Sequence, residues 1–383
     1  MLILHIDIEG GFGGSSRSLA KLVGGLQNIL PNYNSVVLCK ANGPIEILYE
    51  NMGVQCEVFP HMFSRIPLPK YNFRNLLTAI PQLFSIIRLH KKIVSINPDV
   101  VHFNYAGLLF NGLLLKLSGY KGIIIIHSRV VWPDNFFGNV FNYLLRYATD
   151  KVVAIAEPVR QSHVHNGLPD NKVAIIHNPS NVAAAHSVNH DWQKPCTISY
   201  FGTIGNLKGP HRLIELADKL QELEFPYVIN VFGAAPRRKS LTKKLDDELN
   251  SIIERQNSSD ELYRFIYHGH VNDPEEQIAK SDFIVRPSLS NDPWGRDVIE
   301  TMALGRVIVA TGEFDGFVKN KQNGFLVGEW DVDTVAKVII DTWKNPENYA
   351  HICKNAFDFA VVEFHPLTAA KKFVAILGAL GVK

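Results

Sequence analysis

Two carboxylates stand close together in a polar stretch of the sequence, residues 286–306. Asp292 and Glu300 lie eight positions apart, the first in an expected loop and the second in the first turns of a helix expected from about Asp297. A loop carboxylate and a helix carboxylate can hold one ligand from two sides, and both accept hydrogen bonds from the hydroxyls of a sugar. The pair is a candidate sugar-binding site, although chance pairs at this spacing are common.

A glycine-rich loop near the start has the composition of an anion-binding turn. Residues 10–16 follow an expected strand and precede an expected helix, so backbone N–H groups at the helix N-terminus could bind an anion. A dinucleotide fingerprint is broken, because its third glycine falls at Ser16, and no Lys-Ser or Lys-Thr pair of a P-loop follows. A tight turn without a ligand is the remaining alternative.

A second glycine-bearing loop, residues 202–209, ends just before another expected helix. It contains Gly202, Thr203 and Lys208. A lysine in this place can act as a fixed positive charge on a phosphate, although a lone lysine is more often only solvated.

These residues need a fold that brings distant loops together. Short β-branched runs alternate with longer mixed segments, which is the pattern of a parallel sheet covered by helices. Strands are expected at residues 2–7, 35–39, 54–59, 100–104, 123–128, 151–156, 173–177, 197–202, 227–233, 265–269, 283–287, 307–310 and 325–327. Helices are expected at residues 15–28, 209–224, 297–304, 331–343 and 367–380.

The chain is long enough for two domains. Residues 181–195 show neither the helical nor the strand period of apolar side chains, and they end in proline. This predicts a domain boundary there. We expect an N-terminal domain at 1–183, a second domain at 184–366, and a C-terminal helix at 367–383 that could return to the first. The fold class is α/β, with two doubly wound Rossmann-like domains facing a central cleft at the carboxyl ends of their strands.

Composition excludes several classes of protein. The 383 residues are 46% hydrophobic and 20% charged, as in globular proteins. The net charge of +2 is too small to indicate binding to nucleic acid. The four cysteines form no CxxC pair, so neither a disulfide framework nor a metal knuckle is indicated. The first residues read as a strand and not as a signal peptide, and we expect a cytoplasmic protein.

Ordered motifs make the sequence similar to one known family. Asp292, Glu300 and the run Met-Ala-Leu-Gly-Arg-Val-Ile-Val-Ala that ends at residue 310 resemble the signature of the retaining glycosyltransferases of family 4, in which two acids are separated by seven residues. Further matches follow the family's order over nearly the full chain, at residues 97–102, 126–127, 175–178 and 323–327. The resemblance implies the GT-B fold and a hexosyltransferase type of enzyme (EC 2.4).

The resemblance also implies roles for single residues. Glu300 would bind the ribose of a nucleotide sugar, and Asp292 would contact the transferred sugar. Lys208 would hold the diphosphate. The remaining assignments place His127 beside the donor sugar, and give contacts with the donor to Gly13, Gly14, Gly202, Trp294, Gly295 and Arg296.

One departure from the family pattern affects the site. The family usually has an arginine five positions before its lysine, where this chain has Thr203. A departing nucleoside diphosphate develops negative charge, and one lysine balances only a small part of it. We expect Arg286, Arg296 or both to supply the missing charge, and a structural surface role for either is the alternative.

The implied activity is metal-independent sugar transfer with retention at the anomeric carbon. The donor is a nucleotide-diphosphate sugar, and the acceptor is a hydroxyl of a glycan or lipid-linked saccharide, as in cell-surface polysaccharide synthesis. No cofactor and no metal is expected. The pair Asp331 and Asp333 reads as the start of a helix, where acids complement the helix dipole, and not as a metal site.

Two further points stay open at this stage. Residues 74–92 mix apolar and basic side chains and could rest on the inner face of an anionic membrane, although a core helix interrupted by Pro81 is the simpler interpretation. The activity also has rivals, namely a nucleotide-sugar epimerase of the same fold, a catalytically silent GT-B-like binding protein and, more distantly, a dehydrogenase.

Overall fold

The chain forms two compact units. The computed structural model describes residues 1–10, 13–30, 33–62, 73–182, 192–205, 207–234, 243–256, 260–290, 292 and 294–382. The N-terminal unit comprises Met1–Pro179 together with Pro366–Lys383, and the C-terminal unit comprises Ser180–His365. The boundary expected at 183 lies outside the described residues. The last helix begins at Pro366 and belongs to the N-terminal unit.

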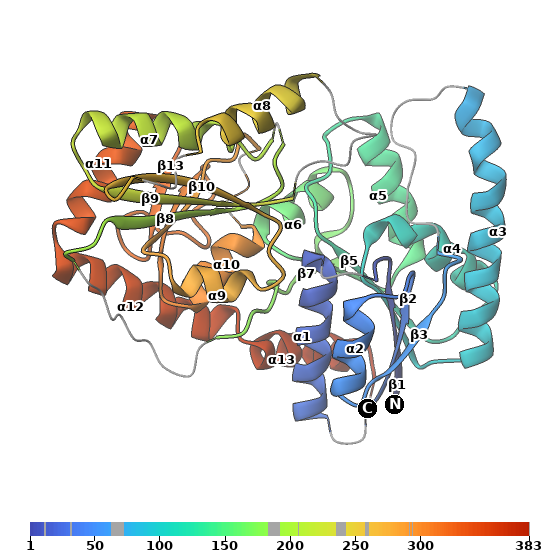
Figure 1. Cartoon of the computed structure of the whole chain (residues 1–383). Coiled ribbons are helices and arrows are strands. Elements are labelled where there is room, and N and C mark those ends of the chain that lie inside the picture. The colour runs from blue at the N-terminus through green and yellow to red at the C-terminus, as the bar shows by residue number, and fades with distance from the viewer. Residues whose placement is uncertain are drawn as a thin grey trace. The chain divides into compact units, whose positions relative to one another are not determined.

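The N-terminal unit is a parallel sheet covered by helices (Figure 1). Its strand order is β3-β2-β1-β4-β5-β6-β7 in the described residues. The strands are β1 (Leu2–Asp7), β2 (Asn34–Cys39), β3 (Gln55–Val58), β4 (Val100–Phe103), β5 (Ile123–Ser128), β6 (Lys151–Ala154) and β7 (Val173–Ile175). The α-helices are α1 (Gly14–Ile29), α2 (Pro44–Asn51), α3 (Phe73–Ile96), α4 (Leu109–Leu117), α5 (Phe136–Ala148), α6 (Glu157–His165) and α13 (Pro366–Ala379), with 3-10 turns η1 (Ala106–Leu108) and η2 (Asp170–Lys172).

The C-terminal unit repeats this plan with the described strand order β10-β9-β8-β11-β12-β13, again all parallel. The strands are β8 (Cys196–Phe201), β9 (Tyr227–Phe232), β10 (Tyr263–Gly269), β11 (Phe283–Arg286), β12 (Val307–Thr311) and β13 (Phe325–Val327). The helices are α7 (Arg212–Glu222), α8 (Lys243–Glu254), α9 (Pro274–Ala279), α10 (Arg296–Ala303), α11 (Val332–Trp343) and α12 (Pro346–Glu363).

The predicted α/β class is confirmed in both units. Every strand expected from the sequence is present, with ends that differ by at most two residues. One helix starts later than expected, because Gly209 has a positive φ of 64° and the chain reaches α7 only at Arg212. Asp331 caps α11 as expected, since its carboxylate accepts the N–H of Thr334 at 3.0 Å.

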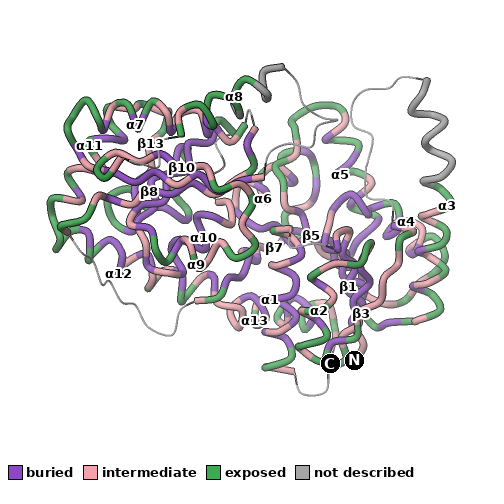
Figure 2. Tube along the Cα trace, in the orientation of Figure 1, coloured by how far each residue is buried: buried purple, intermediate pink, exposed green. Residues whose placement is uncertain are grey.

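The last helix completes the core of the N-terminal unit. Figure 2 shows that central strands of the two sheets, such as β1 and β8, are largely buried, as expected for sheets covered on both faces. Phe373 of α13 is fully buried against residues of the sheet such as Ile125. At Gly25 of α1 a Cβ would lie 2.5 Å from the carbonyl oxygen of Pro366, so the glycine permits the close approach of α1 and α13.

Helix α3 differs from the sequence prediction at Pro81, because it continues through this residue from Phe73 to Ile96. An interior proline removes one hydrogen bond and crowds the carbonyl of the preceding turn, a cost that a helix of 24 residues can accommodate. Leu89 and Ile93 are buried, whereas Phe84 and Ile87 are exposed. Within the described ranges, no helix is long and apolar enough to cross a membrane.

Candidate active site

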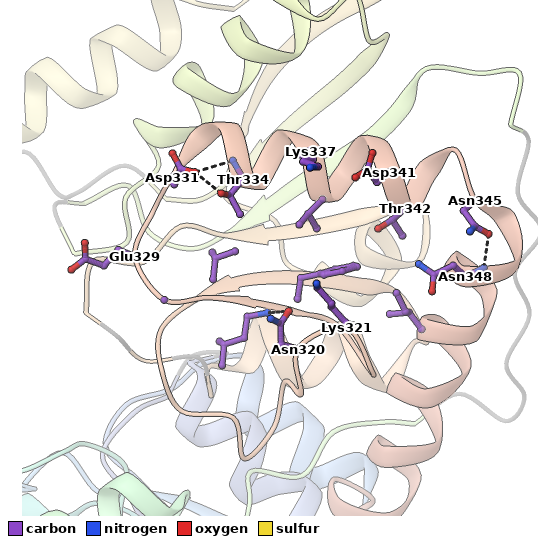
Figure 3. A pocket seen from close by; sticks show the side chains of 16 residues that line it. Asn320, Lys321, Glu329, Asp331, Thr334, Lys337, Asp341, Thr342, Asn345 and Asn348 are labelled. Atoms are coloured by element: carbon purple, nitrogen blue, oxygen red, sulfur yellow. Dashed lines mark hydrogen bonds between the residues drawn. The ribbon is translucent and has the colours of Figure 1, made fainter.

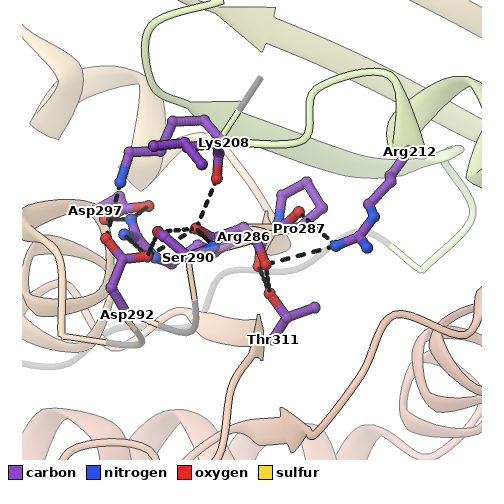
Figure 4. Close-up of polar contacts among 10 residues, drawn as sticks. Lys208, Arg212, Arg286, Pro287, Ser290, Asp292, Asp297 and Thr311 are labelled. Carbon is purple, nitrogen blue, oxygen red and sulfur yellow. Dashed lines mark hydrogen bonds and ion pairs between the residues drawn. The ribbon is translucent and has the colours of Figure 1, made fainter. Parts of the chain in front are cut away.

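The candidate site of the C-terminal unit is built by two loops at one edge of its sheet. Strands β8 and β11 are paired in parallel, so the loops that follow them emerge at the same carboxyl edge. Lys208 comes from the loop after β8, and Asp292 comes from the loop after β11. Their side chains meet with Nζ 2.9 Å from Oδ2 (Figure 4). The sheet topology therefore joins two residues that the sequence separates by 84 positions.

Backbone contacts hold the two loops against each other. The N–H of Leu289 donates to the carbonyl oxygen of Leu207 at 2.9 Å, and the Ser288 hydroxyl oxygen lies 3.1 Å from the same oxygen. Gly209 lies in the left-handed region, and a Cβ there would lie 2.1 Å from the carbonyl oxygen of Pro287. Only glycine combines this φ with this close approach.

Replacing Gly209 by Ala is expected to lower the free energy of unfolding by about 1–3 kcal/mol, because left-handed backbone strain adds to a backbone clash. Gly53→Ala is the matched control. Gly53 has a φ of 67° but nothing within 4 Å of its Cβ position, so it reports the strain alone. Urea denaturation of both variants measures the difference, and equal losses would show that the loops are not in close contact.

Asp292 is surrounded by hydrogen-bond donors of its own chain. Besides Lys208, it is contacted by Nη2 of Arg286 at 2.9 Å and by the hydroxyls of Ser288 at 2.7 Å and Ser290 at 2.6 Å. Burial disfavours its ionised form, but Arg286 and Lys208 outweigh burial and hold the pKa of Asp292 below its usual value. The carboxylate expected to contact the donor sugar is thus ionised and is held by four side chains.

Arg286 is buried between two aspartates. Its Nη1 donates to both carboxylate oxygens of Asp297, while Nη2 pairs with Asp292. The arginine is 5% exposed, and the pKa of its guanidinium is raised because the two carboxylates outweigh the effect of burial. Gly295 leaves room for this arrangement, since a Cβ there would lie 2.4 Å from Nη1 of Arg286.

These four charged residues, Lys208, Arg286, Asp292 and Asp297, form a charge cluster with no net formal charge. Lys208 is its accessible cation, with a side chain 34% exposed against 6% for Arg286. Sequence reasoning did not find Asp297, because an acid in the first turn of a helix is also an ordinary partner of the helix dipole. The signal was its place in the first turn of the helix that follows the strand ending at Arg286.

Arg296 and Glu300 form a pair one turn apart on α10. Nε of Arg296 lies 3.0 Å from Oε1 of Glu300, which is 3% exposed. The predicted ribose ligand and one of the predicted phosphate ligands therefore contact each other. Neighbouring Trp294 donates its N–H to the Asp292 carbonyl at 2.8 Å, so this N–H, which the resemblance assigns to the donor, already has a partner.

Two other predicted residues lie in the loop after β8. The N–H of Gly202 donates to the Phe232 carbonyl at 3.0 Å. Thr203, which stands in place of the family's arginine, is exposed, and its carbonyl accepts a hydrogen bond from the Tyr200 hydroxyl at 3.1 Å.

The predicted residues of the N-terminal unit occupy two places. Gly13 caps α1 and Gly14 begins it. A Cβ on Gly13 would lie 1.7 Å from a carboxylate oxygen of Glu9, so an acidic side chain already approaches this helix N-terminus. His127 lies near the carboxyl end of β5, is 3% exposed, and has a pKa lowered well below the usual value, mainly by burial.

A separate cavity of about 880 Å³ lies beside β13, α11 and the start of α12 (Figure 3). Lys321, Lys337, Glu329 and Asp341 are among its lining residues, and none of the predicted site residues is. Its mixed charges do not favour an anion over a cation, so the charge cluster stays the candidate site.

Comparison with known proteins places these units in a family. Residues 12–183 match the model "Glycosyltransferase Family 4", and residues 184–359 match "Glycosyl transferases group 1". A search of curated proteins gave no match. Among solved structures, the Anabaena protein HepE in complex with UDP-glucose has a TM-score of 0.76 at 18% identity, covering 99% of this chain and 100% of that one.

Two other solved structures share the fold. A glycosyltransferase from Rickettsia africae has a TM-score of 0.73 at 16% identity and covers 100% of this chain and 99% of its own. The lipopolysaccharide outer core galactosyltransferase WaaB, in its apo form, has a TM-score of 0.66 at 14% identity and covers 99% of this chain and 100% of its own. With one family model on each unit and the same fold over whole chains, this protein belongs to the glycosyltransferases of the GT-B fold.

Proposed function

We propose that this glycosyltransferase moves a sugar from a nucleotide-diphosphate sugar to a hydroxyl of a glycan or lipid-linked saccharide, with retention at the anomeric carbon and without a metal ion. The observation that carries the proposal is the charge cluster at the carboxyl edge of the C-terminal sheet. HepE, a protein of the same fold, binds UDP-glucose, and WaaB is a galactosyltransferase of the lipopolysaccharide core.

The cluster explains how one accessible lysine can serve a diphosphate. Asp292 neutralises Lys208 while no anion is bound, so the ammonium keeps a partner in the free protein. An incoming diphosphate carries more negative charge than one carboxylate and competes for Lys208. Asp292 then retains Arg286, Ser288 and Ser290 as partners, so releasing the lysine leaves no unpaired buried charge.

Arg286 therefore acts as a positioning residue in this proposal. Its guanidinium is held by Asp292 and Asp297 and fixes the loop from which Asp292 projects. Lys208 and Arg296 remain to balance the charge that develops on the departing diphosphate. The diphosphate itself helps to deprotonate the incoming hydroxyl on the same face of the sugar, which gives retention.

The activity is tested by incubating the protein with a panel of nucleotide-diphosphate sugars and glycan acceptors in excess chelator. Proton NMR follows the reaction. The expected result is a new anomeric proton with the configuration of the donor. Inversion would overturn retention, and activity only with added metal would overturn the metal-free mechanism. A donor converted without any acceptor would favour an epimerase, and binding without turnover would favour a silent binding protein.

Glu300→Gln is expected to weaken nucleotide binding about tenfold, because a hydrogen bond from the ribose to a charged carboxylate becomes one to a neutral amide. Calorimetric titration with the preferred nucleotide measures the change. Glu276→Gln is the control, since Glu276 is an exposed acid of the same unit that pairs with Lys280. An unchanged affinity in Glu300→Gln would remove Glu300 from the ribose site.

The exposed face of α3 is the proposed contact with the cytoplasmic surface of a membrane. Phe84 and Ile87 are 60% and 43% exposed, and Arg88 and Lys91 lie beside them on the helix. Apolar and basic side chains on one face suit an anionic bilayer interface, where a lipid-linked acceptor would be presented.

The double substitution Phe84→Ser and Ile87→Ser is expected to reduce binding to phosphatidylglycerol vesicles about tenfold or more, because it removes apolar area from the interface. Co-sedimentation measures the bound fraction. The control replaces the exposed Val361 and Val362 of α12 by serine. Equal binding of both variants would mean that α3 does not contact the membrane.

A further inference from the structure

Three histidines lie buried on three neighbouring strands of the N-terminal sheet. His5 is on β1, His102 on β4 and His127 on β5, and these strands are adjacent in the order β1-β4-β5. His5 and His102 occupy paired positions in the ladder. They are 0%, 0% and 3% exposed. Buried polar groups normally need hydrogen-bond partners, and these residues provide them for one another.

Their ring nitrogens form one chain of contacts that begins at a tyrosine. The Tyr33 hydroxyl lies 2.8 Å from Nε2 of His5, and Nδ1 of His5 lies 2.9 Å from Nδ1 of His102. Nε2 of His102 lies 3.3 Å from Nδ1 of His127. Nε2 of His127 ends the chain, buried and without a partner among the described residues.

This series of contacts runs along the sheet, from the amino ends of its strands toward their carboxyl ends. Tyr33 directly precedes β2 (Asn34–Cys39), at the amino edge. His127 is the last but one residue of β5, at the carboxyl edge where parallel sheets bind ligands. A change at Tyr33 can therefore reach His127 through the two histidines between them.

The protons in this chain can be ordered in only two ways. Burial lowers the pKa of His5 to about 3 and the pKa values of His102 and His127 well below the usual value, so each ring carries one proton. Each contact between two nitrogens needs one donor and one acceptor. Fixing the proton at one end therefore fixes every proton along the chain.

Tyr33 selects one of the two orders. Burial raises the pKa of its hydroxyl, which therefore keeps its proton. A phenol O–H is a stronger donor than an imidazole N–H, and an imidazole nitrogen is a stronger acceptor than a phenol oxygen. Tyr33 then donates to His5, His5 donates through Nδ1 to His102, and His102 donates through Nε2 to His127.

We propose that Tyr33, His5 and His102 are positioning residues that fix the proton of His127 on Nε2, so that His127 presents an N–H donor to a sugar oxygen and not a base. The sugar contact of His127 rests on the proposed function. The order of the protons follows from the contacts together with Tyr33 as the donor at their start, and it does not depend on the proposed function. It gives His127 a binding role in transfer because no lone pair of Nε2 remains to accept a proton.

Nitrogen-15 NMR of the full chain without substrate tests the proton order directly, because two-bond couplings distinguish protonated from unprotonated ring nitrogens. Single His→Gln variants assign the signals. The expected result is a proton on Nδ1 of His5 and on Nε2 of both His102 and His127. Histidine in water prefers Nε2, so the His5 state is not a default. A proton on Nδ1 of His127, or an imidazolium there at neutral pH, overturns the proposal.

Tyr33→Phe tests the coupling, because it removes the hydroxyl and keeps the ring. The expected result is a mixture of both proton orders at His127, with kcat for transfer lowered about 2- to 10-fold and nucleotide affinity unchanged. Tyr147→Phe, an exposed tyrosine of the same unit, is the control. An unchanged His127 spectrum in Tyr33→Phe overturns the coupling. The wild-type spectrum decides the proton order even if no transfer is found, which would count against the proposed function alone.

Discussion

Replacing Lys208 by Gln is expected to lower the rate of sugar transfer about 10²- to 10³-fold, because it removes the accessible cation from the point where charge develops on the leaving diphosphate. The fold is expected to survive, since Asp292 keeps its ion pair with Arg286 and its bonds from two serines. Initial rates at saturating acceptor measure the effect, and calorimetry measures the accompanying loss of donor affinity.

Two further variants make this experiment specific. Lys208→Arg keeps the positive charge and should recover part of the rate. Lys280→Gln removes an exposed lysine of the same unit that pairs with Glu276, and should leave the rate unchanged. A fall of less than threefold in Lys208→Gln would show that Lys208 does not hold the diphosphate.

The second large effect is on stability. Arg286→Met is expected to lower the free energy of unfolding by about 3–5 kcal/mol, because it leaves Asp297 and Asp292 in a buried site without the guanidinium that neutralises them. Denaturation in urea measures the loss. Adding Asp297→Asn to this variant should restore part of it, since Asp297 is the carboxylate left without its cation, whereas Asp292 keeps its ion pair with Lys208.

The pH dependence of this loss has a defined sign. In the wild type the pKa of Asp292 is lowered, so its contribution to stability is present above the usual pKa of an aspartate and is lost as the pH falls. Without Arg286 the pKa of Asp292 is lowered less, because Lys208 alone remains as its cation. The difference between the two proteins should therefore stay constant above the usual pKa of an aspartate and shrink as the pH falls below about 4. A difference that does not shrink there would exclude the ion pairs as its source.

Much of the fold follows from local patterns in the sequence. Runs such as Ile123–Ser128 are apolar, β-branched and bounded by turns, so their strands could be located within a residue or two. Asp331 could be assigned as a helix cap because its position directly before an amphipathic segment decides its role. The start of α7 could not be located from the sequence, since the conformation of Gly209 depends on contact with Pro287 in another loop.

The candidate site was predictable in its residues but not in its pairings. Asp292 and Lys208 were found from loops at strand ends, yet their contact depends on β8 lying beside β11, which no local pattern specifies. The burial of Arg286 depends on Asp297, whose sequence position suggests only a helix start. The contact between His5 and His102 likewise requires the register of β1 against β4.

The most direct test of the account is calorimetric titration of the wild-type protein with UDP, GDP, ADP and their sugars in excess chelator. We expect measurable binding of at least one nucleotide and of its sugar, without metal, and weaker binding in Lys208→Gln. Absence of heat for the whole panel at high concentration would contradict the donor class, and binding that appears only when metal is restored would contradict the charge cluster as the diphosphate site.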